Sequence, residues 1–312
     1  MRGISNNFIK NLKNGLLTPL LEYVKEDSNL ILEIREDYIN IYYRGGSLLK
    51  IEEIVRGKSK YKFYFNNKYI LNPKNSRVII TNNMKIIDTT NIRNLKDWID
   101  IIPYIKHEMD KWLSKNKNLE KEYQQTIVRE NNIDLAKSTD YFICDIENTN
   151  KNGRYDLIAV KWISNGAKRK SGKNLKLTFL ELKFGDGALK GSAGLEKHIN
   201  DMDKFLSNPK NIKDIKEEMK IIFNQKLELG LIENQNKIEN FSNEKPEYIL
   251  ILANHDPDST ILRDELEEIQ PNENFDLKIA TSNFMGYGLF EEAIYSIDEF
   301  KNKFFKQIHT KL

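Results

Sequence analysis

Three residues on two neighbouring stretches of the chain have the types and the spacing that metal-assisted hydrolysis requires. Asp156 lies near the start of the apolar run 154–160, and Glu181 and Lys183 end the run 177–183. Residues two apart on a strand point to the same face of a sheet, so Glu181 and Lys183 would project together. Carboxylates suit Mg²⁺, which takes hard oxygen ligands, and a lysine beside the metal offsets developing negative charge. The set predicts hydrolysis of a phosphodiester by metal-activated water.

The spacing alone is a weak signal, because acid-x-Lys triplets recur in this chain rich in lysine and glutamate. Others begin at Asp214, Glu218, Asp276 and Glu299. Those in amphipathic helical stretches are typical of solvated helix faces. Only the triplet at Glu181 follows a strand that carries an aligned acid, Asp156. The alternative interpretation is a surface ion pair between Glu181 and Lys183.

The stretches around these residues predict a mixed sheet. Alternating patterns predict strands at 141–147, 154–163, 175–183, 248–254 and 277–282. Helical periodicity predicts helices at 107–113, 118–130, 195–206, 212–229 and 259–269, with a last amphipathic stretch at 290–305. Three consecutive strands followed by alternating helices and strands indicate a mixed sheet with helices on both sides.

The N-terminal part has a different pattern. A helical stretch at 6–25, interrupted near Thr18 and Pro19, precedes strands at 30–34, 38–43, 48–54 and 61–65. This order predicts a small α+β domain with an antiparallel meander. We therefore expect an accessory domain for substrate or partner recognition at residues 1–95, and a second domain with the candidate site at residues 96–312.

Composition narrows the function classes. The 312 residues carry 49 Lys+Arg against 46 Asp+Glu, a formal net charge of +3, which argues against a histone-like binder but permits local basic patches. With 39% hydrophobic residues the chain is expected to fold, in one large domain or two ordinary ones. The scattered histidines form no recognisable zinc motif, and no serine lies in a nucleophile-elbow pattern.

Cysteine content and hydropathy bear on the compartment. Cys144 is the single cysteine, which excludes intramolecular disulfides and cysteine-based zinc sites. One free thiol fits a reducing compartment. The mean hydropathy of −0.60 predicts no membrane-spanning helix, and residues 1–14 lack the apolar region of a signal peptide. We expect a cytoplasmic protein without a membrane partner.

Asp156 followed by Glu181-x-Lys183 on the next strand resembles the PD-(D/E)xK phosphodiesterase superfamily of restriction-endonuclease-like enzymes. The resemblance covers about residues 115–285. It implies a restriction-endonuclease-like core (αβββαβ, a mixed sheet flanked by helices) in residues 96–312, a mixed α+β and α/β protein overall. It also implies Mg²⁺, or Mn²⁺, held by Asp156 and Glu181, with Lys183 positioning the water. Tyr155 stands where the motif has proline.

The resemblance further implies a nuclease that cleaves nucleic acid, with DNA as the expected substrate, in restriction, phage defence or repair. The alternative is a non-catalytic nucleic-acid-binding or regulatory protein on the same scaffold. A second alternative is an interaction protein whose N-terminal meander docks a partner. Both a monomer and a homodimer or other homo-oligomer stay open.

Members of the superfamily often add a glutamate from the helix before the first strand. Glu120 and Glu122 are the candidates, and Glu120 lies nearer the apolar face formed by Leu119, Tyr123 and Ile127. We therefore assign Glu120 a catalytic role. The run 120–125 also resembles the corresponding helix of Shedu-type defence nucleases. The alternative is an acid that stabilises the helix N-terminus.

Four further residues are candidates for substrate binding. Lys197 and His198 fall on the helix where the superfamily often places polar residues that face substrate. The alternative for His198 is a half-buried side chain bonded to Asp201. Lys170 and Lys173 belong to the basic stretch 168–173, which joins the two candidate strands and is expected to contact phosphates.

Overall fold

A computed structural model of the protein describes residues 2–70, 87–88, 92–150, 153–191, 194–255, 259–282, 291 and 294–304. The chain divides into two compact units. The first comprises Met1–Gln125 and Gln225–Leu231, and the second comprises Thr126–Asn224 and Ile232–Leu312. Both units mix helices with one sheet, as the sequence patterns predicted.

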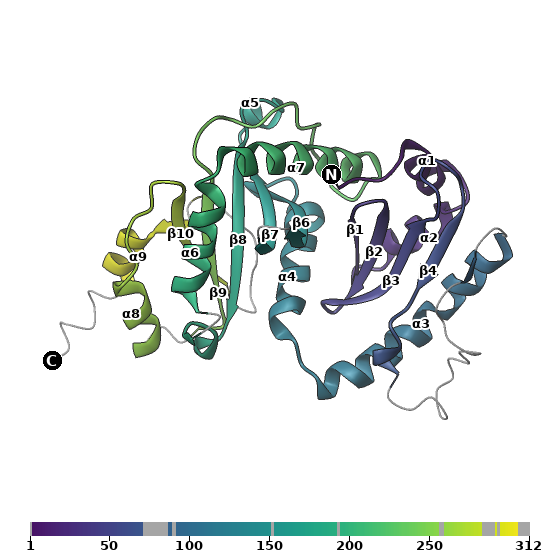
Figure 1. Ribbon diagram of the computed structural model, residues 1–312, viewed down its shortest axis with the longest axis horizontal. Coiled ribbons are helices and arrows are strands. Elements are labelled where there is room, and N and C mark those ends of the chain that lie inside the picture. Colours follow the sequence, from purple (N-terminus) through teal and green to yellow (C-terminus); the bar gives the residue numbers. More distant parts are fainter. Residues whose placement is uncertain are drawn as a thin grey trace. The chain divides into compact units, whose positions relative to one another are not determined.

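The first unit is built on an antiparallel sheet with strand order β1-β2-β3-β4-β5 (Figure 1). Its strands are β1 (Leu30–Ile34), β2 (Tyr38–Tyr43), β3 (Gly46–Glu53), β4 (Tyr61–Tyr64) and β5 (Ile87–Asp88). The predicted antiparallel meander is thereby confirmed. The interruption predicted at residues 18–19 separates α1 (Asn6–Asn14) from α2 (Thr18–Glu26), where Pro19 lies in the first turn. Proline is favoured there because it has no N–H to leave unbonded.

The boundary expected at residue 95 falls inside α3 (Ile92–Lys115), and all of α3 belongs to the first unit. The Trp98 ring of α3 stacks on Phe63 of β4, with ring centroids 5.6 Å apart. Pro103 lies inside α3, where proline removes a helical hydrogen bond. Burial of the apolar face offsets that loss and carries the helix well beyond the predicted 107–113. The next helix, α4 (Leu119–Arg129), begins in the first unit and ends in the second.

A buried ion pair joins the two chain segments of the first unit. Glu33 on β1 and Lys226, near the end of α7 (Pro209–Glu228), are 0% and 1% exposed. The Lys226 Nζ lies 2.7 Å from a carboxylate oxygen of Glu33. Removing one partner of such a pair strands a buried charge, which costs far more than losing an exposed pair. The segment Gln225–Leu231 is therefore held in the first unit by charge as well as by packing.

The second unit contains a mixed sheet with strand order β11-β10-β9-β8-β7-β6. β6 (Tyr141–Asn150), β7 (Gly153–Lys161) and β8 (Lys176–Phe184) are antiparallel neighbours. β9 (Glu247–Ala253) runs parallel to β8, β10 (Asp276–Ser282) runs parallel to β9, and β11 (Ile294–Ser296) is antiparallel to β10. The predicted strands and the mixed sheet are confirmed.

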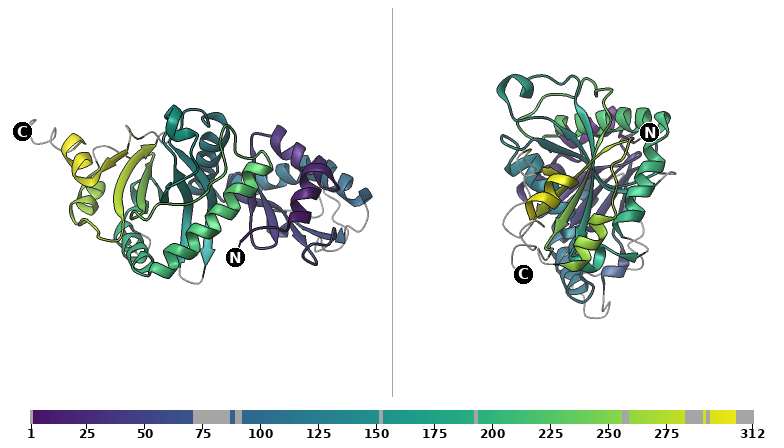
Figure 2. Two further views of the ribbon diagram at one scale, coloured as in Figure 1. Left: turned by 90° about the horizontal axis from the view of Figure 1, so that it is seen from above. Right: turned by 90° about the vertical axis from the view of Figure 1, so that its left-hand side faces the viewer.

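Helices connect the parallel strands of this sheet. α6 (Leu195–Leu206) and α7 follow β8, while α8 (Thr260–Glu267) links β9 to β10. α5 (Gly166–Arg169) lies between β7 and β8, and α9 (Ile297–Phe304) follows β11. α6 and α7 lie beside the strands of this sheet (Figure 1, Figure 2). The rings of Phe205 on α6 and Phe223 on α7 contact Phe179 and Phe142 of the sheet. None of the helices in the described part of the chain is both long and apolar enough to cross a membrane.

Replacing Lys226 with methionine is expected to lower the free energy of unfolding by about 3 kcal/mol, because the buried Glu33 carboxylate loses its ammonium partner at 2.7 Å and keeps the more distant Arg35 guanidinium, at 3.8 Å. Urea denaturation followed by circular dichroism measures this loss. The matched control is Lys13→Met, which breaks an exposed pair with Glu228 and should cost less than about 1 kcal/mol. Equal losses in the two variants would contradict the prediction.

Candidate active site

Asp156, Glu181 and Lys183, three of the four residues expected to perform the chemistry, lie at one end of the β7–β8 pair. The ladder between these strands ends where Leu157 pairs with Leu180. Just beyond it, Asp156 Oδ2 accepts a hydrogen bond from the backbone N–H of Leu182, at 3.0 Å. A side-chain carboxylate thus takes the place of a backbone acceptor where the two strands part.

Glu181 and Lys183 flank Leu182 and contact each other. The Lys183 Nζ lies 3.0 Å from Glu181 Oε1. Asp156, Glu181 and Lys183 are 8%, 5% and 5% exposed. The alternative interpretation, a surface ion pair, does not fit Glu181 and Lys183, because both side chains are buried. Burial of this kind is costly unless the charges compensate one another.

His198 on α6 is a second partner of Glu181. Its Nδ1 lies 3.0 Å from the same Oε1 atom that Lys183 contacts. Burial by itself raises the pKa of the Glu181 carboxyl, but the hydrogen bond to His198 and the charge of Lys183 outweigh it and hold that pKa below its ordinary value. Glu181 is therefore kept as a carboxylate in a buried position.

Tyr248 on β9 was missed by the sequence analysis, because it lies within an apolar strand and gives no local signal. It pairs with Phe179 of β8 and is fully buried. Burial raises the pKa of its hydroxyl, and the nearby carboxylates of Glu181 and Asp156 raise it further. Both carboxylates therefore act on one phenol, which indicates that they converge on the same region.

A cavity of about 620 Å³ adjoins this region. We call it the α6 cavity; its lining includes Tyr155, Glu181, Lys197, His198, Lys204 and Tyr248. Glu181 reaches the cavity wall, whereas Asp156 and Lys183 are not part of the lining. Two of the predicted substrate-binding residues, Lys197 and His198, line this cavity together with Glu181.

The partners of His198 and Asp201 differ from the alternative interpretation of the sequence. His198 was expected to bond to Asp201 if it had no role at the site. Instead, His198 contacts Glu181, and Asp201 pairs with Lys197 one helical turn away, at 2.9 Å. The docking of α6 on the sheet decides this pairing, and sequence spacing alone does not reveal it.

Glu120 and Glu122, the glutamates of α4, belong to the first unit. Glu122 pairs with Arg44 of the first unit, at 3.2 Å, and Gln125 accepts a hydrogen bond from the backbone N–H of Gly45, at 2.7 Å. Gly45 has a positive φ of 72°, and a Cβ there would lie 2.4 Å from Lys121. These residues of the run 120–125 therefore hold a tight turn of the first unit. Glu120 is half-buried in the same unit, and its catalytic role stays a prediction.

The basic stretch 168–173 lies at the other end of the β7–β8 pair. Lys161, the last residue of β7 before this loop, is five residues beyond Asp156, or about 17 Å along a strand. Lys170 is exposed, and Lys173 is exposed and pairs with Glu239 at 3.4 Å. The structure therefore does not bring Lys170 and Lys173 together with Asp156, Glu181 and Lys183.

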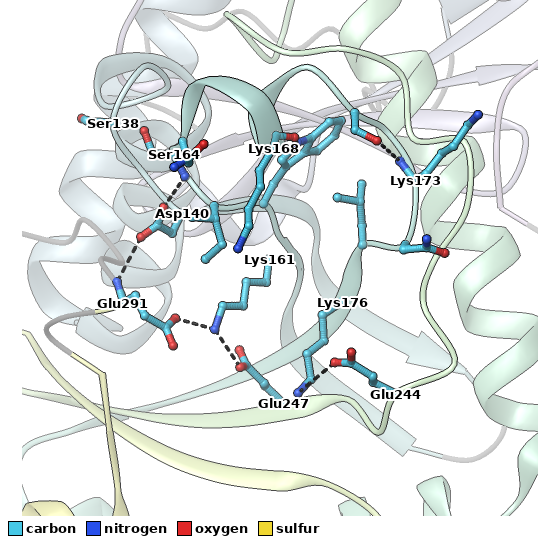
Figure 3. A pocket seen from close by; sticks show the side chains of 16 residues that line it. Ser138, Asp140, Lys161, Ser164, Lys168, Lys173, Lys176, Glu244, Glu247 and Glu291 are labelled. Atoms are coloured by element: carbon cyan, nitrogen blue, oxygen red, sulfur yellow. Dashed lines mark hydrogen bonds and ion pairs between the residues drawn. The ribbon is translucent and has the colours of Figure 1, made fainter.

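This loop borders a second cavity, of about 1,000 Å³, in which lysines face carboxylates (Figure 3). Glu247, almost fully buried, accepts hydrogen bonds from Lys161 and Tyr141, at 3.1 and 2.9 Å. Lys176 contacts Asp276 at 2.6 Å. Lys168 also points into the hollow (Figure 3), and within the described ranges no carboxylate pairs with it. Most of the positive charge of this cavity is thus neutralised locally.

The donor set near Glu181 fits a hard cation better than a zinc ion. Among the residues that the structure describes, no group of three or more His, Cys, Asp or Glu side chains is arranged to hold a metal. Magnesium, however, commonly uses one or two protein carboxylates and completes its shell with water. Asp156 and Glu181 supply that number of carboxylates, so the residues present fit Mg²⁺ or Mn²⁺.

Comparisons of the chain with known protein families, with curated proteins and with solved structures found no match. The resemblance to PD-(D/E)xK enzymes is accordingly one of residues and of element order. The chemistry assigned to this end of the sheet rests on the geometry of Asp156, Glu181, Lys183 and His198.

Replacing Tyr155 with phenylalanine is expected to leave the free energy of unfolding unchanged or to raise it by about 1 kcal/mol. The hydroxyl of Tyr155 is buried and has no hydrogen-bond partner among the described residues, while its ring packs on Phe179 and Phe205. The matched control is Tyr141→Phe, which removes a buried hydrogen bond to Glu247 and should cost about 1–3 kcal/mol. Urea denaturation compares the two, and an equal loss in Tyr155→Phe would refute the prediction.

Asp276 makes the stability of the second unit pH-dependent. Burial raises the pKa of its carboxyl, but hydrogen bonds from Lys176 and Lys245 outweigh burial and lower that pKa. Its contribution to stability is therefore present above the unfolded pKa of about 3.9 and is lost as the pH falls through the lower folded value. Asp276→Asn should be less stable than the parent at neutral pH, with a difference that shrinks in acid. Denaturation curves over this pH range check the sign; a difference that grows in acid would contradict it.

Proposed function

We propose that this chain is a metal-dependent nuclease that hydrolyses phosphodiester bonds of nucleic acid, with DNA as the first substrate to test. The observation that carries the proposal is the gathering of Asp156, Glu181 and Lys183 at one end of the β7–β8 pair. All three are buried ionisable side chains. Buried ionisable side chains that meet beside a cavity are a common mark of a catalytic site.

Each residue has a role that its surroundings support. Asp156 and Glu181 would hold Mg²⁺ or Mn²⁺, and a bound metal supplies an activated water and screens negative charge on the phosphate. Lys183 would orient the attacking water and offset charge that develops on the phosphate oxygens. His198, through its 3.0 Å contact with Glu181, would fix the orientation of that carboxylate. Lys197 would contact the substrate strand.

The order of elements supports a restriction-endonuclease-like core. α4 precedes the antiparallel strands β6, β7 and β8, and α6 and α7 lead to the parallel strand β9. This is the αβββαβ order that the resemblance implies. The first unit would then be an accessory part for substrate or partner recognition, and the enzyme would serve restriction, phage defence or repair.

One observation favours a second candidate, a non-catalytic nucleic-acid-binding protein. Lys183 and His198 both engage the same oxygen of Glu181. The carboxylate therefore already has two positively polarised partners without any metal. If these contacts are permanent, the acid cluster is structural, and binding without cleavage is the function that remains.

Incubation of the full chain with plasmid, single-stranded DNA and RNA, in Mg²⁺, Mn²⁺ or EDTA, tests the nuclease proposal. Metal-dependent cutting is expected, with a loss of at least about a hundredfold in Lys183→Ala, because one electrostatic contact to the transition state is removed. The matched control is Lys220→Ala, from a Glu-x-Lys triplet on helix α7, which should cut like the parent. Cutting that survives in Lys183→Ala would refute the assigned site.

Metal binding separates the two candidate functions. Calorimetric titration with Mn²⁺ should show binding that Asp156→Asn weakens, because an amide oxygen is a poorer ligand than a carboxylate. The amide can still accept the hydrogen bond from Leu182, so the strand end should keep its structure. No metal binding and no cutting would leave the non-catalytic candidate.

A further inference from the structure

One face of α6 presents polar side chains to the α6 cavity. Lys197, Asp201 and Lys204 line it, and Asn208, just after the helix, continues the row. Their spacings of four, three and four residues place them on one side of a helix. The row therefore extends along the helix from the Glu181 end of the cavity, where His198 contacts that carboxylate.

The charges along this row leave one cation without a partner. Lys197 pairs with Asp201 at 2.9 Å, and Arg154, at the strand side of the cavity, pairs with Glu147 at 3.2 Å. Lys204 is exposed, and nowhere in the described part of the chain does a carboxylate pair with it. The cavity thus offers one uncompensated ammonium, which suits one phosphate group.

Part of the cavity wall is apolar, beside further polar side chains such as Arg154 and Asn211. Tyr155, Met202 and Phe205 line it, and all three are largely buried in the core beneath. Aromatic and apolar side chains in a cavity wall can pack against a flat organic ligand while polar groups fix its orientation. A nucleobase is a ligand of this kind, with the phosphate of its nucleotide at the charged rim.

The size of the cavity limits what can enter. Its volume of about 620 Å³ lies within the range of about 300–1,000 Å³ that proteins use for small ligands. His198 and Lys204 are six residues apart, or about 9 Å along the helix axis. One helical turn of duplex DNA spans about 34 Å, so the cavity accommodates a nucleotide and not a duplex.

We propose that the α6 cavity receives one unpaired nucleotide of the substrate, with its base against Tyr155, Met202 and Phe205 and a phosphate at Lys204. The inference rests on the proposed nuclease function and names its substrate class: single-stranded or locally unpaired nucleic acid. A paired base must first leave its stack to enter such a cavity, which costs a few kcal/mol. Single strands avoid that cost.

Fluorescence anisotropy in EDTA tests this inference without any cleavage. The probes are a short fluorescein-labelled DNA strand and the same strand in a blunt duplex, bound to the full chain at several salt concentrations. The single strand should bind at least about tenfold more tightly than the duplex, since unstacking costs a few kcal/mol. Lys204→Ala should weaken single-strand binding and reduce the salt slope by about 0.7, the value for one phosphate contact.

The matched control is Lys213→Ala, an exposed lysine of α7 that does not line the α6 cavity. It should leave both the affinity and the salt slope close to those of the parent. Equal or tighter binding of the duplex, no binding of either probe, or a Lys204→Ala variant that behaves like Lys213→Ala would overturn the inference.

The two proposals fail in different ways. If the protein cuts in a metal-dependent way but binds the duplex at least as tightly as the single strand, the nuclease proposal stands and the proposal of a nucleotide cavity is refuted. If the protein prefers the single strand through Lys204 but does not cut in any metal, the nuclease proposal is refuted and the protein is a single-strand-binding protein instead.

Discussion

The candidate site depends on one hydrogen bond, from the backbone N–H of Leu182 to the carboxylate of Asp156. A buried N–H must be bonded, and in a regular ladder a backbone carbonyl of the neighbouring strand would accept it. Here a side chain accepts it instead, so the strands can part without leaving an unsatisfied group. Because Leu182 is fixed in this way, Glu181 and Lys183 on either side of it are fixed as well.

The same arrangement explains how charged side chains persist in a sheet interior. Glu181 loses its hydration on burial, and contacts with Lys183 and His198 replace part of it. The lysine and the histidine come from different elements, a strand and a helix. Their convergence ties the position of α6 to the charge state of the strand end, so that packing and electrostatics at this site are not independent.

Much of the second unit could be predicted from local patterns. Strands whose residues alternate between apolar and polar, or are wholly apolar, begin and end at recognisable points in the sequence. Because residues two apart on a strand share a face, Glu181 and Lys183 were predicted to project together, and they are in contact. Other features depend on docking, which spacing does not encode. His198 contacts Glu181 because α6 docks on the sheet. Tyr248 lies near the site because β9 pairs with β8. The length of α3 likewise follows from Trp98 packing on the first sheet, which outweighs the local effect of Pro103.

The first unit is made of two chain segments that are far apart in the sequence. Its chain leaves after Gln125 and returns only for Gln225–Leu231. A contiguous N-terminal fragment would therefore lack Lys226, whose ammonium lies 2.7 Å from the buried Glu33. Such a fragment would contain a buried carboxylate whose partner lies 193 residues further along the chain. The first unit of this protein is thus not a portable module, and its function must be studied in the intact chain.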